Sequence, residues 1–183
     1  MRVIAGKYKS IKLNSVDGIN TRPTTDKIKE NLFNMLDCEG RVLDLFGGTG
    51  GLGIESLSRG ADYVTFIDGS NNAIKVIRSN IEKCRIPNSE YDIYRNDYKS
   101  ALKILGKKGE KFDLIFLDPP YDKGLINQAI SSILENDVCS DGCLIVCEKS
   151  VDEVVESKFE KLELVKEKKY GITNIIIFEY MEN

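Results

Sequence analysis

The stretch Val42-Leu-Asp-Leu-Phe-Gly-Gly-Thr-Gly-Gly-Leu-Gly53 decides the fold of this 183-residue chain. Its apolar first part is typical of a buried strand, and five glycines then fall within seven positions. Glycines let the backbone turn sharply and lie close to a ligand, and a helix expected near 52–59 presents a positive N-terminus there. The stretch therefore predicts a strand, a ligand-binding loop and a helix in succession.

Strands and helices alternate along the rest of the chain. This alternation predicts an α/β fold with a mainly parallel sheet that is covered on both faces. Residues 166–171 leave no room for a helix between the last two strands, which should form a hairpin with one antiparallel strand. Strands are expected over 42–46, 63–67, 91–94, 113–117, 143–147, 161–165 and 174–178, and helices near 52–59, 71–84, 98–106 and 123–136.

The N-terminal residues are expected to form a small appendage to this sheet. Residues 2–13 have the pattern of two short strands that turn at Gly6-Lys7. Thr24 or Thr25 can cap a helix whose apolar stripe runs from Ile28 to Leu36. We therefore expect a single domain over 1–183, with an N-terminal β-hairpin extension over 1–21 and a catalytic α/β core over 22–183.

Composition excludes several classes of protein. No apolar run approaches the roughly 20 residues that span a bilayer, and no signal region is visible, so a cytoplasmic protein is expected. The net charge of −3 combines a balance of +4 in residues 1–35 with −7 in the remainder. The basic N-terminal segment is compatible with a local phosphate contact or with a solvated charged face.

The sequence lacks the histidines and the cysteine spacing that usually build metal sites and activated nucleophiles. The chain has no histidine, which removes Ser-His and Cys-His mechanisms. Cys139, Cys143 and Cys147 recur every four residues, but this spacing fits neither the usual zinc pairs nor iron–sulfur runs. We interpret the five cysteines as buried thiols and expect no metal.

The glycine loop predicts an adenosine-containing cofactor without identifying it. Gly48-Thr-Gly50-Gly-Leu-Gly53 satisfies the dinucleotide fingerprint, and Asp68 closes the next strand where a ribose-binding acid belongs. Asp97 follows the third strand and could accept from an adenine amino group or cap the next helix. A nicotinamide-dependent oxidoreductase therefore stays open at this point.

Asp118-Pro119-Pro120-Tyr121 follows the strand over 113–117, at the edge where open α/β sheets place their chemistry. Two prolines make a short rigid loop that can aim the Asp118 side chain and the Pro119 carbonyl at one point. Two acceptors suit an exocyclic amine. By accepting hydrogen bonds from both of its N–H groups, they free the nitrogen lone pair for attack on a sulfonium methyl. Tyr121 can stack on the target base. This loop favours methyl transfer, and a dehydrogenase gives no reason for it.

The sequence also resembles the bacterial RsmD-type methyltransferases, which form N2-methylguanine in 16S ribosomal RNA. The resemblance covers nearly the whole chain. The Asp-Pro-Pro-Tyr and glycine loops are shared by many amino-methyltransferases. The N-terminal segment that begins at Arg2 and the block that begins with Arg22-Pro-Thr are more particular to this family. The motifs are Arg2-Val-Ile-Ala-Gly-Lys, Arg22-Pro-Thr-Thr-Asp-Lys-Ile-Lys-Glu-Asn-Leu-Phe33, Leu43-Asp-Leu-Phe-Gly-Gly-Thr-Gly50, Gly53-Ile-Glu-Ser-Leu-Ser-Arg-Gly60, Asp118-Pro-Pro-Tyr121 and Tyr170-Gly171.

The resemblance implies a Rossmann-like class I methyltransferase fold, a seven-stranded sheet with its last strand antiparallel, and S-adenosyl-L-methionine as cofactor. It implies ribosomal RNA or the assembling small subunit as partner, and we expect a monomer. The sequence departs from the family pattern at two points: Gly48 stands where relatives often carry alanine, and the chain after residue 35 is unusually acidic. The implied cofactor residues are Asp44, Phe46, Gly47, Gly48, Gly50, Asp68, Asp97, Tyr98 and Thr25, and the expected RNA contacts are Arg2, Lys7, Lys9, Lys12 and Arg22.

Other functions remain alternatives at this stage. A DNA adenine-N6 or a protein glutamine methylase could use the same Asp-Pro-Pro-Tyr loop, although the chain shows no separate target-recognition domain. An RNA-binding protein without activity could also have kept a cofactor fold. The substrate prediction therefore depends on residues 2–33 and not on the loop.

Overall fold

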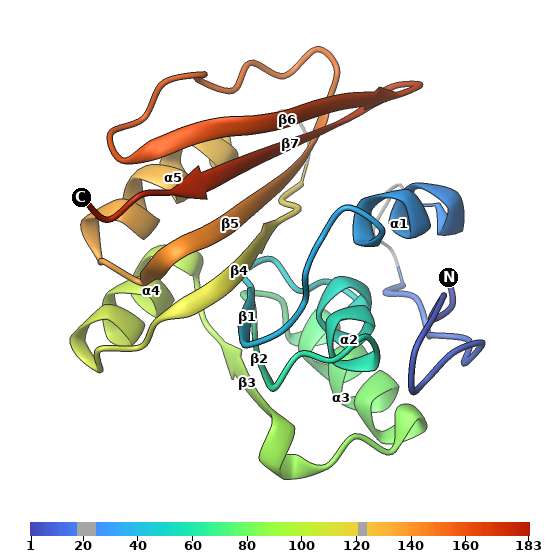
Figure 1. The fold of residues 1–183 in the computed structure, drawn as a ribbon. Helices are drawn as coiled ribbons and strands as arrows, with labels where there is room; N and C mark the ends of the chain where they lie inside the picture. The colour runs from blue at the N-terminus through green and yellow to red at the C-terminus, as the bar shows by residue number, and fades with distance from the viewer. Residues whose placement is uncertain (18–24, 121–123) are drawn as a thin grey trace.

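The computed structural model describes residues 1–17, 25–120 and 124–183, so the predictions for Arg22, Thr24 and Tyr121 lie outside the described residues. A seven-stranded sheet in the order β3-β2-β1-β4-β5-β7-β6 runs through the molecule (Figure 1). The strands are β1 (Arg41–Asp44), β2 (Tyr63–Asp68), β3 (Tyr91–Arg95), β4 (Phe112–Leu117), β5 (Cys139–Ser150), β6 (Leu162–Tyr170) and β7 (Thr173–Tyr180).

The predicted parallel sheet with one antiparallel strand is confirmed. β3, β2, β1, β4 and β5 pair in parallel, and β7 is antiparallel to both β5 and β6. The last strand is thus inserted between two earlier ones. β5 begins at Cys139, four residues before the predicted strand, after a shift in the β4–β5 register between Phe112 and Leu114.

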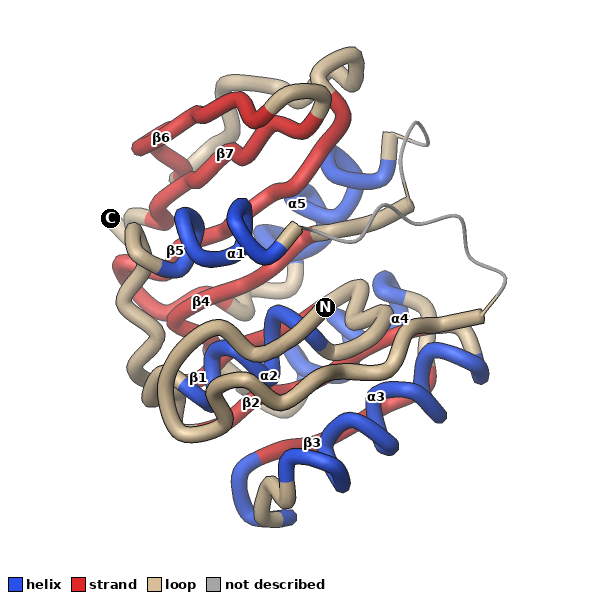
Figure 2. The backbone as a smooth tube through the Cα atoms, turned by 90° about the vertical axis from the view of Figure 1, so that its right-hand side faces the viewer, coloured by secondary structure: helices blue, strands red, loops and turns tan. Residues whose placement is uncertain are grey.

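Helices cover both faces of the sheet and separate two apolar clusters. On one face, α1 (Asp26–Phe33), α2 (Gly51–Ser58) and α3 (Asn71–Cys84) pack on side chains that include Val42, Phe116 and Val146. On the other face, α4 (Tyr98–Lys107) and α5 (Leu125–Glu135) pack on side chains that include Leu43 and Cys147. Figure 2 shows α1, α2 and the N-terminal segment lying in front of the strands.

The N-terminal segment differs from the predicted pair of strands. Residues 1–13 double back on themselves, but a single antiparallel bridge, Arg2 to Lys12, replaces the ladder. The N–H groups of Lys7 and Tyr8 donate instead to the carbonyl and hydroxyl of Ser58 in α2, at 2.8 and 2.9 Å. Backbone groups used in this way are not available for strand pairing. The segment is a strap across α2 that has the course of a hairpin.

The side chains agree with the expected core. All five cysteines are free and buried. Within residues 1–17, 25–120 and 124–183, no cluster of three or more histidine, cysteine or acidic side chains could hold a metal. No helix in the described ranges is long and apolar enough to cross a membrane.

Candidate active site

Four neighbouring strands end at one edge of the sheet and bring the predicted acidic residues to it. Asp44 ends β1, Asp68 ends β2 and Asp118 follows β4, while Asp97 lies two residues beyond β3. Because these strands are adjacent and parallel, their carboxyl ends lie side by side. This is the edge at which open α/β sheets bind ligands.

The glycine loop is held against β2 and turns directly into α2. The Gly47 N–H donates to the Ile67 carbonyl at 2.8 Å, and Gly50 caps α2 with a φ of 78°, a conformation that glycine adopts without strain. A Cβ on Gly53 would lie 2.3 Å from Cε1 of Phe66, so glycine there lets α2 approach β2 closely. The loop thus presents backbone N–H groups and a helix N-terminus at the edge.

Asp68 fastens this loop to the end of β2. Its Oδ2 accepts from the Gly48 N–H at 2.9 Å, and its Oδ1 accepts from the Ser70 N–H at 2.8 Å. A carboxylate has about four acceptor sites, so each oxygen keeps capacity for a further donor. Asp68 can therefore position the loop and accept from a ribose hydroxyl.

Asp97 caps a helix, which was one of the two predicted alternatives. Its Oδ1 accepts from the Ser100 N–H at 2.9 Å, and this bond lowers the pKa of the exposed carboxyl. The next residue, Tyr98, lies against Phe46 with ring centroids 5.3 Å apart. This aromatic pair joins the end of β3 to the glycine loop, as a cofactor site spanning both would need.

Asp44 is a buried carboxyl under the loop. It is 1% exposed, and its Oδ2 accepts from the Gly53 N–H at 3.1 Å. Burial raises its pKa to about 7, with a smaller contribution from the charge of Asp68 and against the bond from Gly53. A buried carboxyl with so high a pKa favours a cation beside it.

Asp118 completes a group of three acidic side chains, one of which the sequence analysis missed. Burial raises the pKa of Asp118 well above its ordinary value, and the charges of Glu148 and Asp44 raise it further. Glu148 lies in β5 and is 4% exposed. The sequence signal that could have identified Glu148 is its position directly after the apolar run Cys143–Cys147, at the end of a predicted strand. Pro119 is buried and Pro120 exposed, in the loop that follows β4.

The predicted RNA contacts lie on the N-terminal strap. Arg2, Lys7, Lys9 and Lys12 are all exposed, whereas Arg22 is outside the described residues. Arg2 pairs with Asp26 at 3.1 Å and Lys7 with Glu90 at 3.8 Å. Thr25 caps α1 by accepting from the Ile28 N–H at 3.3 Å, and its described contacts do not join it to the loop residues.

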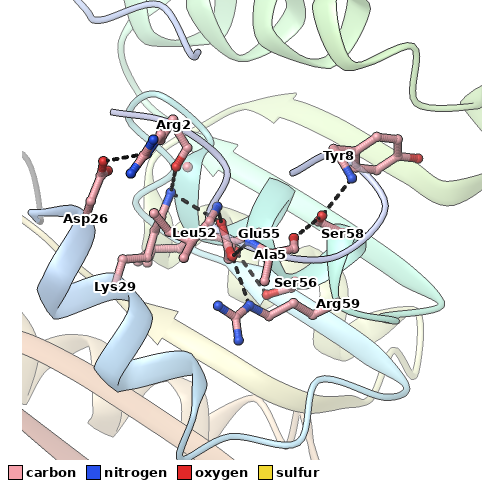
Figure 3. Close-up of polar contacts among 12 residues, drawn as sticks. Arg2, Ala5, Tyr8, Asp26, Lys29, Leu52, Glu55, Ser56, Ser58 and Arg59 are labelled. Carbon is pink, nitrogen blue, oxygen red and sulfur yellow. Dashed lines mark hydrogen bonds and ion pairs between the residues drawn. The ribbon is translucent and has the colours of Figure 1, made fainter. Parts of the chain in front are cut away.

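Glu55 in α2 anchors the strap (Figure 3). Its carboxylate accepts from the N–H groups of Ile4 and Ala5 at 2.9 and 3.2 Å, and it pairs with Lys29 and with Arg59. Lys29 has no exposed side-chain surface, so it cannot serve as a phosphate contact despite the basic character of its segment. A Cβ on Gly51 would lie 2.5 Å from Sδ of Met1, so the strap also reaches the start of α2.

Comparison with known proteins assigns a family to this arrangement. A family model described as Conserved hypothetical protein 95 matches residues 1–179. The chain is 38% identical to the Bacillus subtilis protein named "Putative rRNA methyltransferase YlbH", over 98% of each chain. It is 33% identical to ribosomal RNA small subunit methyltransferase D of Haemophilus influenzae, over 98% of this chain and 93% of that one.

Solved structures agree with the fold. The Escherichia coli protein described as "Putative methyltransferase yhhF" superposes with a TM-score of 0.87 at 28% identity, over 100% of this chain and 99% of that one. A protein named SMU.776, solved with SAH, superposes with a TM-score of 0.66 over 76% of this chain and 44% of that one. At 15% identity, this second likeness concerns the fold alone. The predicted Rossmann-like fold is confirmed.

Proposed function

The chain belongs to the RsmD family of methyltransferases, and we propose that it methylates the exocyclic N2 amine of a guanine in small-subunit ribosomal RNA. S-adenosyl-L-methionine is the proposed methyl donor. The observation that carries the proposal is the position of Asp118 and Pro119, which follow β4 directly beside the glycine loop and Asp44. An amine acceptor loop and an adenosine-type cofactor loop thus share one edge of the sheet.

The donor set at the edge suits this cofactor. S-adenosyl-L-methionine supplies an electrophilic methyl group on a positively charged sulfonium. Asp44 is buried and Asp118 is partly buried, both near other acidic groups, so the pKa of each is raised, and a cation beside them would relieve that cost. Asp68 would accept from the ribose, and Phe46 with Tyr98 would flank the adenine next to Asp97.

Asp118 and the Pro119 carbonyl are the proposed acceptors for the two N–H bonds of the amine. Hydrogen bonds to both draw the nitrogen out of conjugation with the ring, so that its lone pair can attack the methyl carbon. The new C–N bond forms as the methyl–sulfur bond breaks, and the nitrogen then loses one proton to solvent. Pro120 keeps the loop rigid, and Tyr121 is proposed to stack on the base.

The strap is the proposed RNA contact, since it carries exposed cations next to the cofactor loop. Lys9 and Lys12 form no ion pair within the described residues and can neutralise phosphates directly. Arg2 and Lys7 would exchange a carboxylate partner for a phosphate, and Arg22 stays in the proposed set. We propose one functional domain over 1–183, with residues 1–21 as its RNA-binding extension and 22–183 as its catalytic core.

Product identification tests the proposal. The purified protein is incubated with labelled S-adenosyl-L-methionine and either deproteinised small-subunit ribosomal RNA or isolated small subunits, and the digested nucleosides are separated by mass spectrometry. We expect N2-methylguanine at one position. Labelled N6-methyladenine from DNA, or methylated glutamine in protein, with none in RNA, would reject the RNA substrate.

A further inference from the structure

Glu148 lies in β5, the strand that neighbours β4 in the sheet (Figure 1), and Asp118 directly follows β4. The β4–β5 register ends with Leu117 opposite Cys147, so Asp118 and Glu148 each come directly after this last pair, and the charge of Glu148 acts on Asp118. Neighbouring strands of a sheet lie about 5 Å apart. The proposed amine acceptor therefore has a second carboxylate as its direct neighbour.

The side chain of Glu148 is directed to the face of the sheet that α1 covers. Side chains alternate between faces along a strand. Phe116 and Val146 belong to the apolar cluster under α1, whereas Leu117 and Cys147 belong to the cluster under α4 and α5. Glu148, one residue further along β5, returns to the α1 face, where it is paired with Ile175 of that cluster, and its charge acts on Asp118.

The cost of this arrangement calls for an explanation. Glu148 is 4% exposed, and its negative charge makes the charged form of the neighbouring Asp118 carboxyl less favourable. Hydrophobic residues occupy the positions before it in β5, from Cys143 to Cys147, so a smaller or apolar side chain would suit the strand. Such unfavourable pairs of acidic groups are typical of functional sites.

We propose that Glu148 selects guanine by accepting a hydrogen bond from the ring N1–H while Asp118 accepts from the adjacent amino group. Among the nucleobases with an exocyclic amine, guanine alone has a ring N–H next to that amine. Adenine and cytosine present a ring nitrogen lone pair there, which a carboxylate would repel. The inference rests on the proposed function, because it concerns the base that enters the same site.

Glu148 can fill this role alongside its other contacts. A carboxylate accepts about four hydrogen bonds, and one from the base uses only part of that capacity. A site built to bond a polar group of the substrate rejects an analogue that lacks it, since its own buried group is then left without that bond. The pair of carboxylates would therefore both orient guanine and exclude the other amino bases.

The test uses RNA with 2-aminopurine at the target position found by product mapping. This base keeps the amine but has a lone pair in place of the N1–H. We measure kcat/KM for guanine and 2-aminopurine RNA with the wild type, Glu148→Gln, Glu148→Asp and, as a control on the same sheet, Glu179→Gln. The Gln amide can donate to the lone pair, so we expect Glu148→Gln to raise the 2-aminopurine-to-guanine ratio about tenfold or more.

The variants separate selection from a structural role. Glu148→Asp keeps the charge and should slow methylation of guanine while it still rejects 2-aminopurine, and Glu179→Gln should match the wild type in both respects. An unchanged ratio in Glu148→Gln, with guanine still methylated by the wild type, overturns the role of Glu148 alone. A wild type that forms no N2-methylguanine overturns the proposed function itself.

Discussion

Glu55 in α2 and Lys29 in α1 form an ion pair 3.3 Å long in which neither side chain has exposed surface. Burial lowers the pKa of Lys29, and the charge of Glu55 opposes that shift. The same carboxylate accepts from the backbone of Ile4 and Ala5, so one side chain joins the strap, α1 and the helix that follows the cofactor loop. Glu55 is therefore a shared anchor for these three elements, in addition to the bonds that join the strap to Ser58 of α2.

Glu55→Gln should be severely destabilising. The change leaves Lys29 buried without its counter-ion, and breaking a buried pair in this way typically costs about 3–5 kcal/mol. Urea denaturation measures the free energy of unfolding. Glu82→Gln, at an exposed position of α3, is the matched control and should change it by less than about 0.5 kcal/mol. Equal stability of the two variants would contradict the importance of the pair.

Gly53→Ala should also destabilise the protein, although alanine usually favours a helix. The added Cβ would meet Cε1 of Phe66 at 2.3 Å and Cγ1 of Val64 at 2.9 Å, so α2 would have to move away from β2. Overpacking of this kind costs about 1–3 kcal/mol, seen as a lower denaturation midpoint. Gly69→Ala is the control because its nearest atom, the Asn96 carbonyl oxygen, is 3.7 Å away. A gain in stability for Gly53→Ala would show that α2 packs against β2 more loosely than these distances indicate.

The alternation of strands and helices could be predicted from the sequence because each element carries its own periodicity. Strand order is different. The β6–β7 hairpin is local and was predicted, but the pairing of β7 with β5 joins residues that are distant in sequence. The strap shows the same limit. Its residues have a strand-like pattern, but their N–H groups bond to Glu55 and Ser58, some 50 positions away.

The candidate site could be predicted to a similar degree. Asp44 and Asp68 end strands and Asp118 directly follows one, and that position alone places them at the functional edge. Glu148 also follows an apolar run, but its importance comes from the register that sets it beside Asp118. Lys29 was counted with the basic N-terminal segment, and only packing reveals that it is buried.

Lys9→Gln combined with Lys12→Gln should weaken RNA binding. Each lost phosphate contact should make the slope of log K against log salt shallower by about 0.7–0.9. Both the KM for RNA and this slope are measured by titration. The control, Lys103→Gln with Lys107→Gln, removes the same charge from α4 on the opposite face and should leave both unchanged. Equal effects of the two pairs would indicate a nonspecific loss of charge and would refute a contact at the strap.

Asp44 should make the protein less stable as the pH rises. Its pKa is raised from 3.8 to about 7 on folding, so between these values the folded chain holds a proton that the unfolded chain has lost. This stabilisation is complete below the lower value and is lost as the pH passes the higher one. Urea denaturation from about pH 5 to about pH 8 should show a steeper fall for the wild type than for Asp44→Asn. Parallel curves would mean that the carboxyl stays ionised in the folded protein.

Asp118→Asn should slow methyl transfer severely and leave cofactor binding intact. The substitution keeps the shape of the side chain but puts an amide donor where an acceptor is proposed, and loss of one such group costs about 100- to 1,000-fold in kcat. Single-turnover rates with RNA and calorimetry with S-adenosylhomocysteine measure the two properties separately. Because the pKa of Asp118 is well above its ordinary value, the wild-type rate should also fall with decreasing pH sooner than for an ordinary aspartate. Near-normal rates in Asp118→Asn would show that another group at the carboxyl edge of the sheet polarises the amine.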